Sequence, residues 1–342
     1  MTRLRDRGGG SRSAGRFSVA VVQGGPSTEA EVSRASAAGV AKALEEAGHR
    51  VVRLELDAYL AESLRTGGYD VAFPVAHGAV GEDGSLQGLF EVLGLPYVGS
   101  NVLASATAMH KRVARVLLGS GGLPVAKGIA IARGDARAAA EQARREVGRR
   151  VVVKPSSQGS CIGVSRLDAS ESTDEVARAL EAVWAIDEFA IVEHFAIGRE
   201  VTCGVLDLDA ATALPPTEVL SPLDPFYTYE ARYAPGRSVH VCPAELAPDV
   251  LRRVQRFAVA AHTVLGCRDL SRVDFIVGDG DDRSEVVTLL EVNTLPGMTA
   301  TSLYPEAAAA HGLSMPGLCD ALVARAHARG STPRHGARPL PR

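Results

Sequence analysis

The sequence is short of lysine, has no paired cysteines and contains no long apolar run. Only four of its 37 basic residues are lysine, so a lysine that remains is expected to be needed as lysine. The five cysteines form no Cys-x-x-Cys pair, which argues against a zinc knuckle or a disulfide framework and favours a reducing compartment. Apolar stretches such as Phe17 to Val22 are far shorter than the roughly 20 residues of a membrane span. We therefore expect a cytoplasmic protein that does not enter a membrane.

Two further absences narrow the function. The net charge of -3, from 37 basic and 40 acidic residues, provides no positive field for nucleic acid, which we do not expect as a partner. The chain has no P-loop motif and no G-x-G-x-x-G after its first predicted strand, so the standard nucleotide-binding signatures are missing. With 342 residues, 46% of them hydrophobic, the composition is that of a soluble enzyme with more than one domain.

The chain does show an α/β alternation. A buried strand over 17–23, a helix over 31–47 and a strand over 50–56 predict a parallel sheet. We expect three α/β units, at 16–104, 105–196 and 197–329. A Pro- and Tyr-rich loop is expected at 221–240. Segments rich in Gly, Ser, Pro and Arg predict disordered tails at 1–15 and 330–342. Further helices are expected at 105–118, 135–147, 248–265 and within 303–328.

A glycine- and serine-rich loop follows a predicted strand that ends in Lys154-Pro155. Its residues, 156–163, are small enough for backbone N–H groups to approach a phosphate, and the lysine would supply a fixed positive charge. A flexible hairpin loop explains the same residues equally well, so both interpretations stay open at this point.

Two later strands carry a set of oxygen donors. Arg272 and Asp274 are two apart in one predicted strand, and Glu291 and Asn293 are two apart in the next, so each pair shares a face. If the strands are neighbours, Asp274, Glu291 and Asn293 converge, and an oxygen-only set favours magnesium over zinc. The alternative is a structural ion pair between Arg272 and Glu291.

Polar residues near the amino terminus have ordinary explanations when taken singly. Glutamates in the segment 24–33 would lie in the first turn of a helix, where acidic residues are common partners of the helix dipole. His77 follows a strand, and Asp83 or Ser85 could cap the next helix.

Taken together, these segments resemble the D-alanine:D-alanine ligases of the ATP-grasp superfamily over residues 17–329. The segments that carry the resemblance, in the family's order, are GGPSTEAEVS, HGAVGEDGSLQG, LPYVGS, KPSSQGSCIGV, FYTYEARY, CPAEL, LSRVDF and LLEVNTLPGMTATSLYP. The resemblance implies an ATP-grasp fold, with a Rossmann-like first unit and ATP bound between the central and carboxy-terminal units.

The resemblance also implies a reaction and its cofactors. Two D-alanines would be joined through an acylphosphate for peptidoglycan synthesis, with ATP and two Mg²⁺ ions, or Mn²⁺ in their place. The implied metal ligands are Asp274, Glu291 and Asn293. The implied ATP-binding residues are Lys111, Lys154, Ser160, Glu193, His194, Ala196, Glu200, Arg232 and Asn293. The residues implied in catalysis or substrate binding are Glu31, His77, Ser160, Tyr233, Arg272, Gly297, Ser302 and Leu303.

Several of these residues have a stated role by the same resemblance. Glu31 would hold the ammonium of the first D-alanine, in a network with Ser160 and Tyr233. Arg272 and the N–H of Gly297 would stabilise the oxyanion, and the loop 221–240 would close as a lid that excludes water. Lys111 and Lys154 have independent support, because they are two of only four lysines. A homodimer is implied by the resemblance alone.

The sequence departs from the family pattern at a few positions and leaves two alternatives open. Arg232 and His110 stand where lysine and aspartate are usual, and Thr228 and Cys161 also differ. One alternative is a related ligase that adds D-serine, D-lactate or another D-amino acid, in a resistance or specialised-metabolite pathway. The other is an inactive nucleotide-binding module, which the complete set of metal and phosphate ligands disfavours. Tyr233 in the lid favours dipeptide formation.

Overall fold

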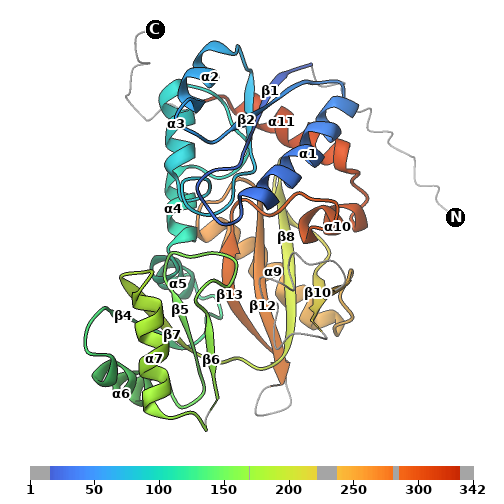
Figure 1. Cartoon of the computed structure of the whole chain (residues 1–342). Helices are drawn as coiled ribbons and strands as arrows, with labels where there is room; N and C mark the ends of the chain where they lie inside the picture. The colour runs from blue at the N-terminus through green and yellow to red at the C-terminus, as the bar shows by residue number, and fades with distance from the viewer. Residues whose placement is uncertain (1–15, 169, 222–236, 280–284, 332–342) are drawn as a thin grey trace, which may run out of the picture.

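The first of three sheets in the structure is parallel (Figure 1). The computed structural model describes residues 16–331, except 169, 222–236 and 280–284. The order in the first sheet is β2-β1-β3, with β1 (Ser18–Gln23), β2 (Arg50–Glu55) and β3 (Val71–Pro74). Helix α1 (Ala30–Glu46) connects β1 to β2, so this is the parallel sheet that the alternation predicts. The short helices that follow are α2 (Leu60–Thr66) and α3 (Ser85–Leu93).

The second sheet is antiparallel and has four strands in the order β4-β7-β5-β6. These strands are β4 (Gly128–Ala132), β5 (Val151–Pro155), β6 (Ser165–Leu167) and β7 (Phe189–His194). Two helices pack on the sheet through a shared apolar cluster, α6 (Ala136–Glu146) and α7 (Thr173–Trp184). The helix expected at 135–147 is therefore present, whereas α7 was not anticipated.

The third sheet is antiparallel and contains the predicted carboxylate strands. Its order is β11-β10-β8-β12-β13, and β9 pairs with β8. Its strands are β8 (Arg199–Asp207), β9 (Ala211–Ala213), β10 (Thr217–Leu220), β11 (Val239–Val241), β12 (Asp269–Asp279) and β13 (Glu285–Asn293). Helix α9 (Pro248–Val264) covers it, as expected for 248–265. Most of the predicted lid, 222–236, lies outside the described residues.

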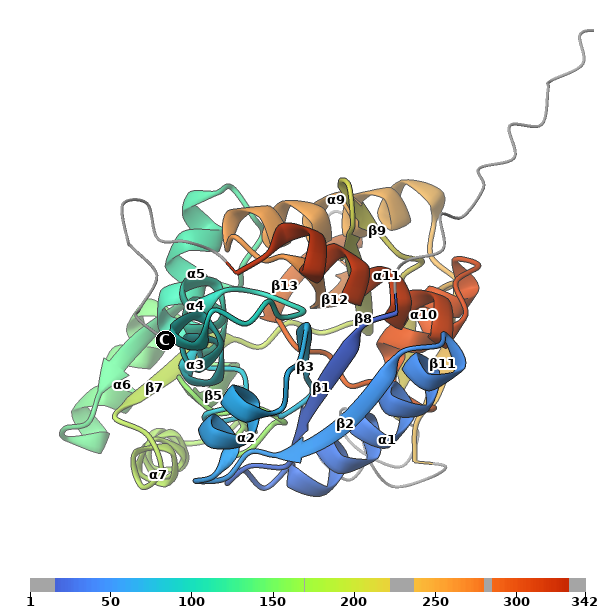
Figure 2. The same cartoon turned by 90° about the horizontal axis from the view of Figure 1, so that it is seen from above.

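The core of the first sheet is completed by the end of the chain. The closing helices are α10 (Leu303–Ala310) and α11 (Met315–Arg329). Leu318 and Leu322 of α11 are fully buried in one cluster with Val19 and Val21 of β1. Figure 2 shows α2 and α3 on one side of the first sheet, with α1, α10 and α11 on the other. The three sheets fall within the three predicted ranges, but the first and third units share this core, and the unit boundaries stay a prediction.

The helix expected at 105–118 is two helices. They are α4 (Val102–Met109) and α5 (Lys111–Ser120), separated by His110, whose φ of -91° and ψ of 89° are not helical. The amide of Lys111 donates to the carbonyl of Ser156 at 2.7 Å. This bond between segments far apart in sequence starts a new helix at Lys111 and brings that lysine beside the loop 156–163.

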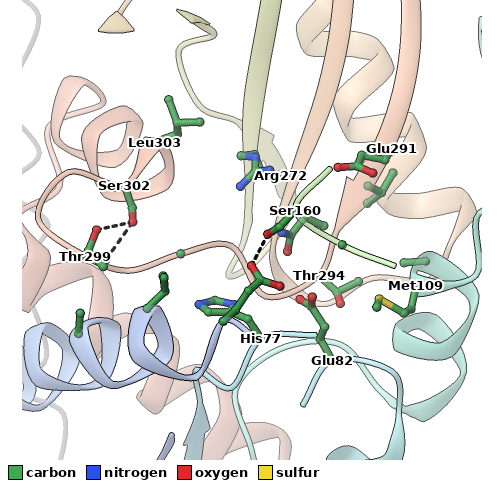
Figure 3. A pocket seen from close by; sticks show the side chains of 18 of the residues that line it. His77, Glu82, Met109, Ser160, Arg272, Glu291, Thr294, Thr299, Ser302 and Leu303 are labelled. Carbon is green, nitrogen blue, oxygen red and sulfur yellow. Dashed lines mark hydrogen bonds between the residues drawn. The ribbon is translucent and has the colours of Figure 1, made fainter. Parts of the chain in front are cut away.

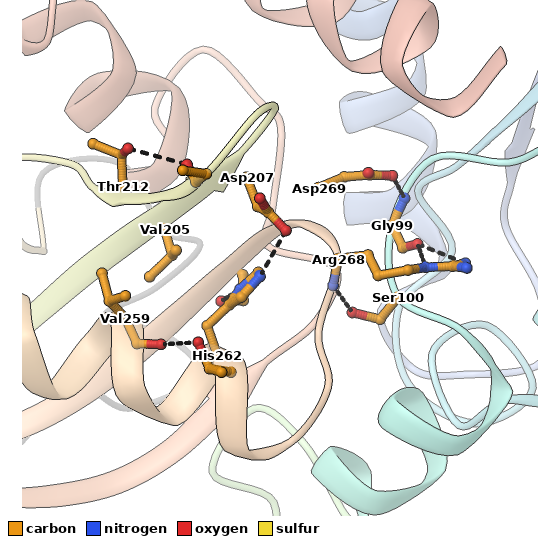
Figure 4. Close-up of polar contacts among 12 residues, drawn as sticks. Gly99, Ser100, Val205, Asp207, Thr212, Val259, His262, Arg268 and Asp269 are labelled. Atoms are coloured by element: carbon orange, nitrogen blue, oxygen red, sulfur yellow. Dashed lines mark hydrogen bonds and ion pairs between the residues drawn. The ribbon is translucent and has the colours of Figure 1, made fainter. Parts of the chain in front are cut away.

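A buried carboxylate ties the first unit to the third (Figure 4). Asp269 is 1% exposed and has a φ of +62°, a conformation that aspartate tolerates better than most residues. It accepts a hydrogen bond of 2.7 Å from the amide of Gly99 and pairs with the guanidinium of Arg329. Arg329 also donates to the carbonyl of Tyr97 at 2.7 Å. We call Asp269, Gly99, Tyr97 and Arg329 the Asp269 clamp.

No helix within the described ranges is long and apolar enough to span a bilayer.

We expect Asp269→Ala to lower the free energy of unfolding by about 3–5 kcal/mol, because it leaves Arg329 without its buried carboxylate partner. Asp269→Asn keeps an acceptor for Gly99 and tolerates the left-handed φ, so its effect should be smaller. Urea unfolding followed by circular dichroism measures both. The exposed Asp209→Ala is the control, with an expected change below about 0.5 kcal/mol. Equal effects of all three substitutions would contradict the clamp.

Candidate active site

Two adjoining cavities lie where the three units meet. The larger cavity has a volume of about 450 Å³ and is lined mainly from the first and third units, with Glu29, His77, Glu82 and Arg272 among its residues (Figure 3). The smaller cavity, of about 130 Å³, is lined mainly from the second and third units. Four residues line both, namely Lys111, Gly159, Glu291 and Leu303.

The loop after Lys154 reaches across to the first unit. The hydroxyl of Ser160 donates to the carboxylate of Glu29, and both residues line the larger cavity (Figure 3). Ser160 and Cys161 have φ values of +48° and +59°, in the left-handed region that residues other than glycine rarely adopt. The loop therefore has a specific bent conformation that presents a hydroxyl to the larger cavity.

The geometry corrects one expectation, because the contact with Ser160 belongs to Glu29 and not to Glu31. Glu29 precedes α1 and is 6% exposed. Glu31 lies in the first turn of α1 at the rim of the larger cavity, with its side chain 86% exposed and paired with Arg34. At 3.6 residues per turn, residues two apart near a helix start point in nearly opposite directions. The motif GGPSTEAEVS contains both glutamates, and the residues alone do not show which one faces inward.

The two carboxylate strands are neighbours, as the oxygen-donor hypothesis requires. Strands β12 and β13 pair so that Asp274 is opposite Glu291 and Arg272 is opposite Asn293. Residues directly opposite in an antiparallel pair point to the same face. The four side chains therefore form one polar group on one face of the third sheet.

Within this group each carboxylate has a basic neighbour. Arg272 donates two hydrogen bonds of 2.8 Å to Asp274, which lies two residues away in the same strand. Thr202 Oγ1 donates a third, of 2.6 Å, to Asp274. Glu291 Oε2 lies 3.3 Å from Nζ of Lys111.

The donor set fits magnesium. Asp274, Glu291 and Asn293 offer two carboxylates and an amide oxygen, and Mg²⁺ is commonly held by one or two carboxylates together with substrate phosphates. Among the residues that the structure describes, no group of three or more His, Cys, Asp or Glu side chains is placed to hold a metal. Phosphate oxygens of a nucleotide, together with water, would complete such a site.

Glu193 is held between two cations at the smaller cavity. Nζ of Lys154 lies 2.6 Å from one carboxylate oxygen, and the guanidinium of Arg115 contacts the other. Burial acts to raise the pKa of Glu193, but Lys154 and Arg115 outweigh it and the pKa is lowered overall. Glu193 is therefore ionised at neutral pH.

Three more of the residues predicted to bind ATP come shortly after Glu193 in the chain. The structure brings these three residues, His194, Ala196 and Glu200, together in the wall of the smaller cavity. Glu200 lies 3.1 Å from the guanidinium of Arg166, which was not anticipated. The two lid residues of the predicted site, Arg232 and Tyr233, lie outside the described residues.

The turn after β13 forms part of the wall of the larger cavity. The amide of Thr299 donates to Ser302 Oγ at 3.0 Å, and the amide of Met298 donates to Ser36 Oγ of α1 at 3.2 Å. A Cβ atom at Gly297 would lie 2.9 Å from Ser302 Oγ, so glycine permits the close approach. The structure thus places Gly297 and Ser302 side by side in the lining of the larger cavity, which also includes Glu29.

Two buried groups face the larger cavity with one atom each unpaired. His77 Nε2 and Glu82 Oε2 have no hydrogen-bond partner among the described residues. The amide of Gly78 donates to the other oxygen of Glu82 at 3.0 Å. Burial, with the nearby charge of Glu29, raises the pKa of Glu82 to about 8, and burial lowers the pKa of His77. Both are neutral near pH 7. Glu82 was not among the residues predicted for the site.

Comparisons with known proteins agree on one family. The family model described as D-ala D-ala ligase C-terminus matches residues 117–324, and the one described as D-ala D-ala ligase N-terminus matches residues 60–100. A D-alanine--D-alanine ligase of Geobacter sulfurreducens is 43% identical over 290 residues, which are 85% of this chain and 87% of that protein.

Solved structures share the fold. The D-alanine--D-alanine ligase of Bacillus anthracis complexed with ATP superposes with a TM-score of 0.75 at 28% identity, covering 92% of this chain and 98% of that one. The VanG D-Ala:D-Ser ligase of Enterococcus faecalis superposes with a TM-score of 0.77 at 28% identity, covering 91% of this chain and all of that one. This ATP-grasp architecture is therefore common to ligases that differ in their second substrate.

The raised pKa of Glu82 predicts a pH-dependent stability. The folded pKa of about 8 exceeds the ordinary 4.5, so the folded protein holds this proton more tightly than the unfolded chain. The stability from neutral Glu82 is complete below about pH 4.5 and is lost as the pH rises through 8. Glu82→Gln stays neutral at every pH. Its free energy of unfolding, relative to that of the wild type, should therefore rise by roughly 1–4 kcal/mol as the pH is raised from 5 to 9.

Urea unfolding at pH 5, 7 and 9 measures this difference. The exposed Glu141→Gln on α6 is the control and should show no such trend. A difference between Glu82→Gln and the wild type that does not change with pH would show that Glu82 is ionised throughout.

Proposed function

The chain belongs to the D-alanine–D-alanine ligase family, and we propose that it joins two D-alanines to D-alanyl-D-alanine for peptidoglycan synthesis, converting ATP to ADP and phosphate. The observation that carries this proposal is the shared wall of the two cavities. Lys111 and Glu291 line both cavities. The larger cavity has acidic and basic side chains that suit an amino acid, and the smaller one has basic residues that suit a nucleotide. A phosphoryl group can pass between two substrates only at such a boundary.

The smaller cavity would hold ATP. Lys111 and Lys154 contact the phosphates, and Glu193, His194 and Ala196 meet the adenine, with Glu200 at the ribose. Lys111 suits its role because its Nζ donates to the carbonyl of Gln158 at 2.7 Å, which holds the ammonium beside the loop 156–163. Ser160 of that loop lies toward the γ-phosphate.

The larger cavity would hold the two amino acids. Glu29, in place of Glu31, binds the ammonium of the first D-alanine, since it is the buried carboxylate in contact with Ser160. The carboxylate of this D-alanine attacks the γ-phosphorus at the shared wall. A new P–O bond forms as the bond to ADP breaks, and the product is an acylphosphate.

The second step forms the peptide bond. The neutral amine of the second D-alanine, bound near Ser302 and Leu303, attacks the carbonyl carbon of the acylphosphate. Arg272 and the N–H of Gly297 face the oxyanion of the tetrahedral intermediate, which collapses with loss of phosphate, and the proton released by the amine leaves with the phosphate as hydrogen phosphate. Removing one donor of this kind lowers kcat by about 10²–10³.

Asp274, Glu291 and Asn293 would hold magnesium, which when bound neutralises charge on the β- and γ-phosphates. Two of these ligands also have basic partners, because Asp274 pairs with Arg272 and Glu291 with Lys111. These pairs place the two carboxylates at the boundary of the cavities, where Glu291 lines both cavities and Asp274 lines the smaller one.

Some expectations stay predictions. These are the roles of Tyr233 and Arg232 in a lid at 221–240, a homodimer and a cytoplasmic location. A ligase that adds D-serine or D-lactate is not favoured, since the curated relative at 43% identity is a D-alanine--D-alanine ligase.

The proposed function predicts the product directly. With ATP, Mg²⁺ and each D-amino acid in turn, the purified protein should release ADP fastest with D-alanine alone, and mass spectrometry should identify alanyl-alanine as the main product. D-lactate and D-serine, each offered with D-alanine, test the alternative. A mixed dipeptide or depsipeptide as the main product would move the enzyme to that class, and no ADP release with any of them would refute ligation.

The assignment of Glu29 predicts unequal effects at the two glutamates. Glu29→Gln should lower kcat/KM for D-alanine by about 10² or more, because a buried charged hydrogen bond to the substrate ammonium is lost. Glu31→Gln, which affects an exposed pair with Arg34, should stay within about threefold of the wild type. Steady-state ADP release measures both. A larger loss at Glu31 would restore the original assignment.

A further inference from the structure

Arg115 contacts Glu193 but is not among the residues that line the smaller cavity. It projects from the second turn of α5, and its side chain is 14% exposed. One guanidinium nitrogen reaches the carboxylate of Glu193, and another donates to the carbonyl of Ala126 at 2.9 Å. Arg115 thus lies behind Glu193, on the side away from the nucleotide.

The backbone leaves room for this approach. A Cβ atom at Gly128 of β4 would lie 3.0 Å from a guanidinium nitrogen of Arg115 and 2.4 Å from the carbonyl oxygen of Val192. Glycine at this position therefore lets β4 lie close to β7 while the guanidinium passes beside it. The arrangement fixes Arg115 between two anchors, so its fork is held before any ligand arrives.

Positive charges outnumber negative ones around Glu193. Glu193 is one buried carboxylate, and it has two cations, Lys154 on the cavity side and Arg115 on the far side. The two bonds use different carboxylate oxygens. Lys154 lies on the cavity wall, where the proposed function requires its ammonium to contact a phosphate. Its bond to Glu193 competes with that contact.

We propose that Arg115 is a positioning residue that keeps Glu193 paired while Lys154 transfers its ammonium to a nucleotide phosphate. This inference rests on the proposed function. With Arg115 present, the carboxylate retains a cation when Lys154 moves, so no buried charge is left alone. Without Arg115, Lys154 is held by Glu193, and phosphate binding requires an unpaired buried carboxylate.

The test separates phosphate binding from base binding. Isothermal titration calorimetry compares the dissociation constants of ADP with Mg²⁺ and of adenosine, which has no phosphate. Arg115→Met, of similar length and without charge, should weaken ADP binding by about tenfold or more, the range of one charged hydrogen bond. Adenosine binding should change less than about threefold, because Glu193 still has Lys154 as a partner. The exposed Arg145→Met on α6 is the matched control.

A double-mutant cycle tests the route through Glu193. In a Glu193→Gln background there is no carboxylate to hold Lys154, so Arg115→Met should then have little further effect on ADP binding. Arg115→Lys keeps the positive charge but not the forked guanidinium, and should recover most of the affinity for ADP that Arg115→Met loses. It also replaces Arg115→Met in this test if that variant does not fold.

Three results would overturn the inference. They are no loss of ADP affinity in Arg115→Met, equal losses for ADP and adenosine, or the same loss in the Glu193→Gln background. If the wild-type protein binds ADP and ligates D-alanine, these results reject only the role of Arg115. If the wild type binds no ADP, the proposed nucleotide site itself is wrong.

Discussion

The active-site region depends on one constraint, that a carboxylate removed from water must be paired or neutral. Glu193 meets it with Lys154 and Arg115, Asp274 with Arg272, and Glu291 with Lys111. Glu82 meets it in the other way, by retaining its proton. Each of these four acidic groups around the two cavities is thus either paired with a basic side chain or protonated. The placement of its few lysines follows from this, because two of the four are partners in these pairs.

The same pairs hold the groups of the proposed active site in fixed positions. Lys111, Lys154 and Arg272, which pair with these carboxylates, are also the groups that a phosphate or an oxyanion would contact under the proposed function. Binding then exchanges one partner for another and needs little rearrangement of charge, which is the preorganisation that makes electrostatic catalysis effective. The Asp269 clamp supports this arrangement, since it holds the first unit, with Glu29 and His77, against the third unit, with Arg272 and Gly297.

Much of the fold could be predicted because it depends on local patterns. The strand–helix–strand order over β1, α1 and β2 predicted a parallel sheet, and the two-residue spacing around Asp274 and Glu291 predicted a shared face once the strands were neighbours. Helix α7 was missed although Ser172 and Glu175 form a capping box that the sequence displays. Other features could not be read locally: the break at His110 depends on a bond to a distant strand end, and the choice between Glu29 and Glu31 depends on where α1 begins.

The cover of the first sheet by α11 has a consequence for biosynthesis. The strands β1 and β2 and the helix α1 leave the ribosome long before the residues that complete their core, such as Leu318 and Leu322. Until then the apolar face of β1 and α1 lacks part of its natural neighbour. Contacts that span most of a chain form slowly, and exposed apolar surface favours aggregation. The amino-terminal unit therefore cannot reach its native packing during translation, and loss of the last helix would damage the first sheet.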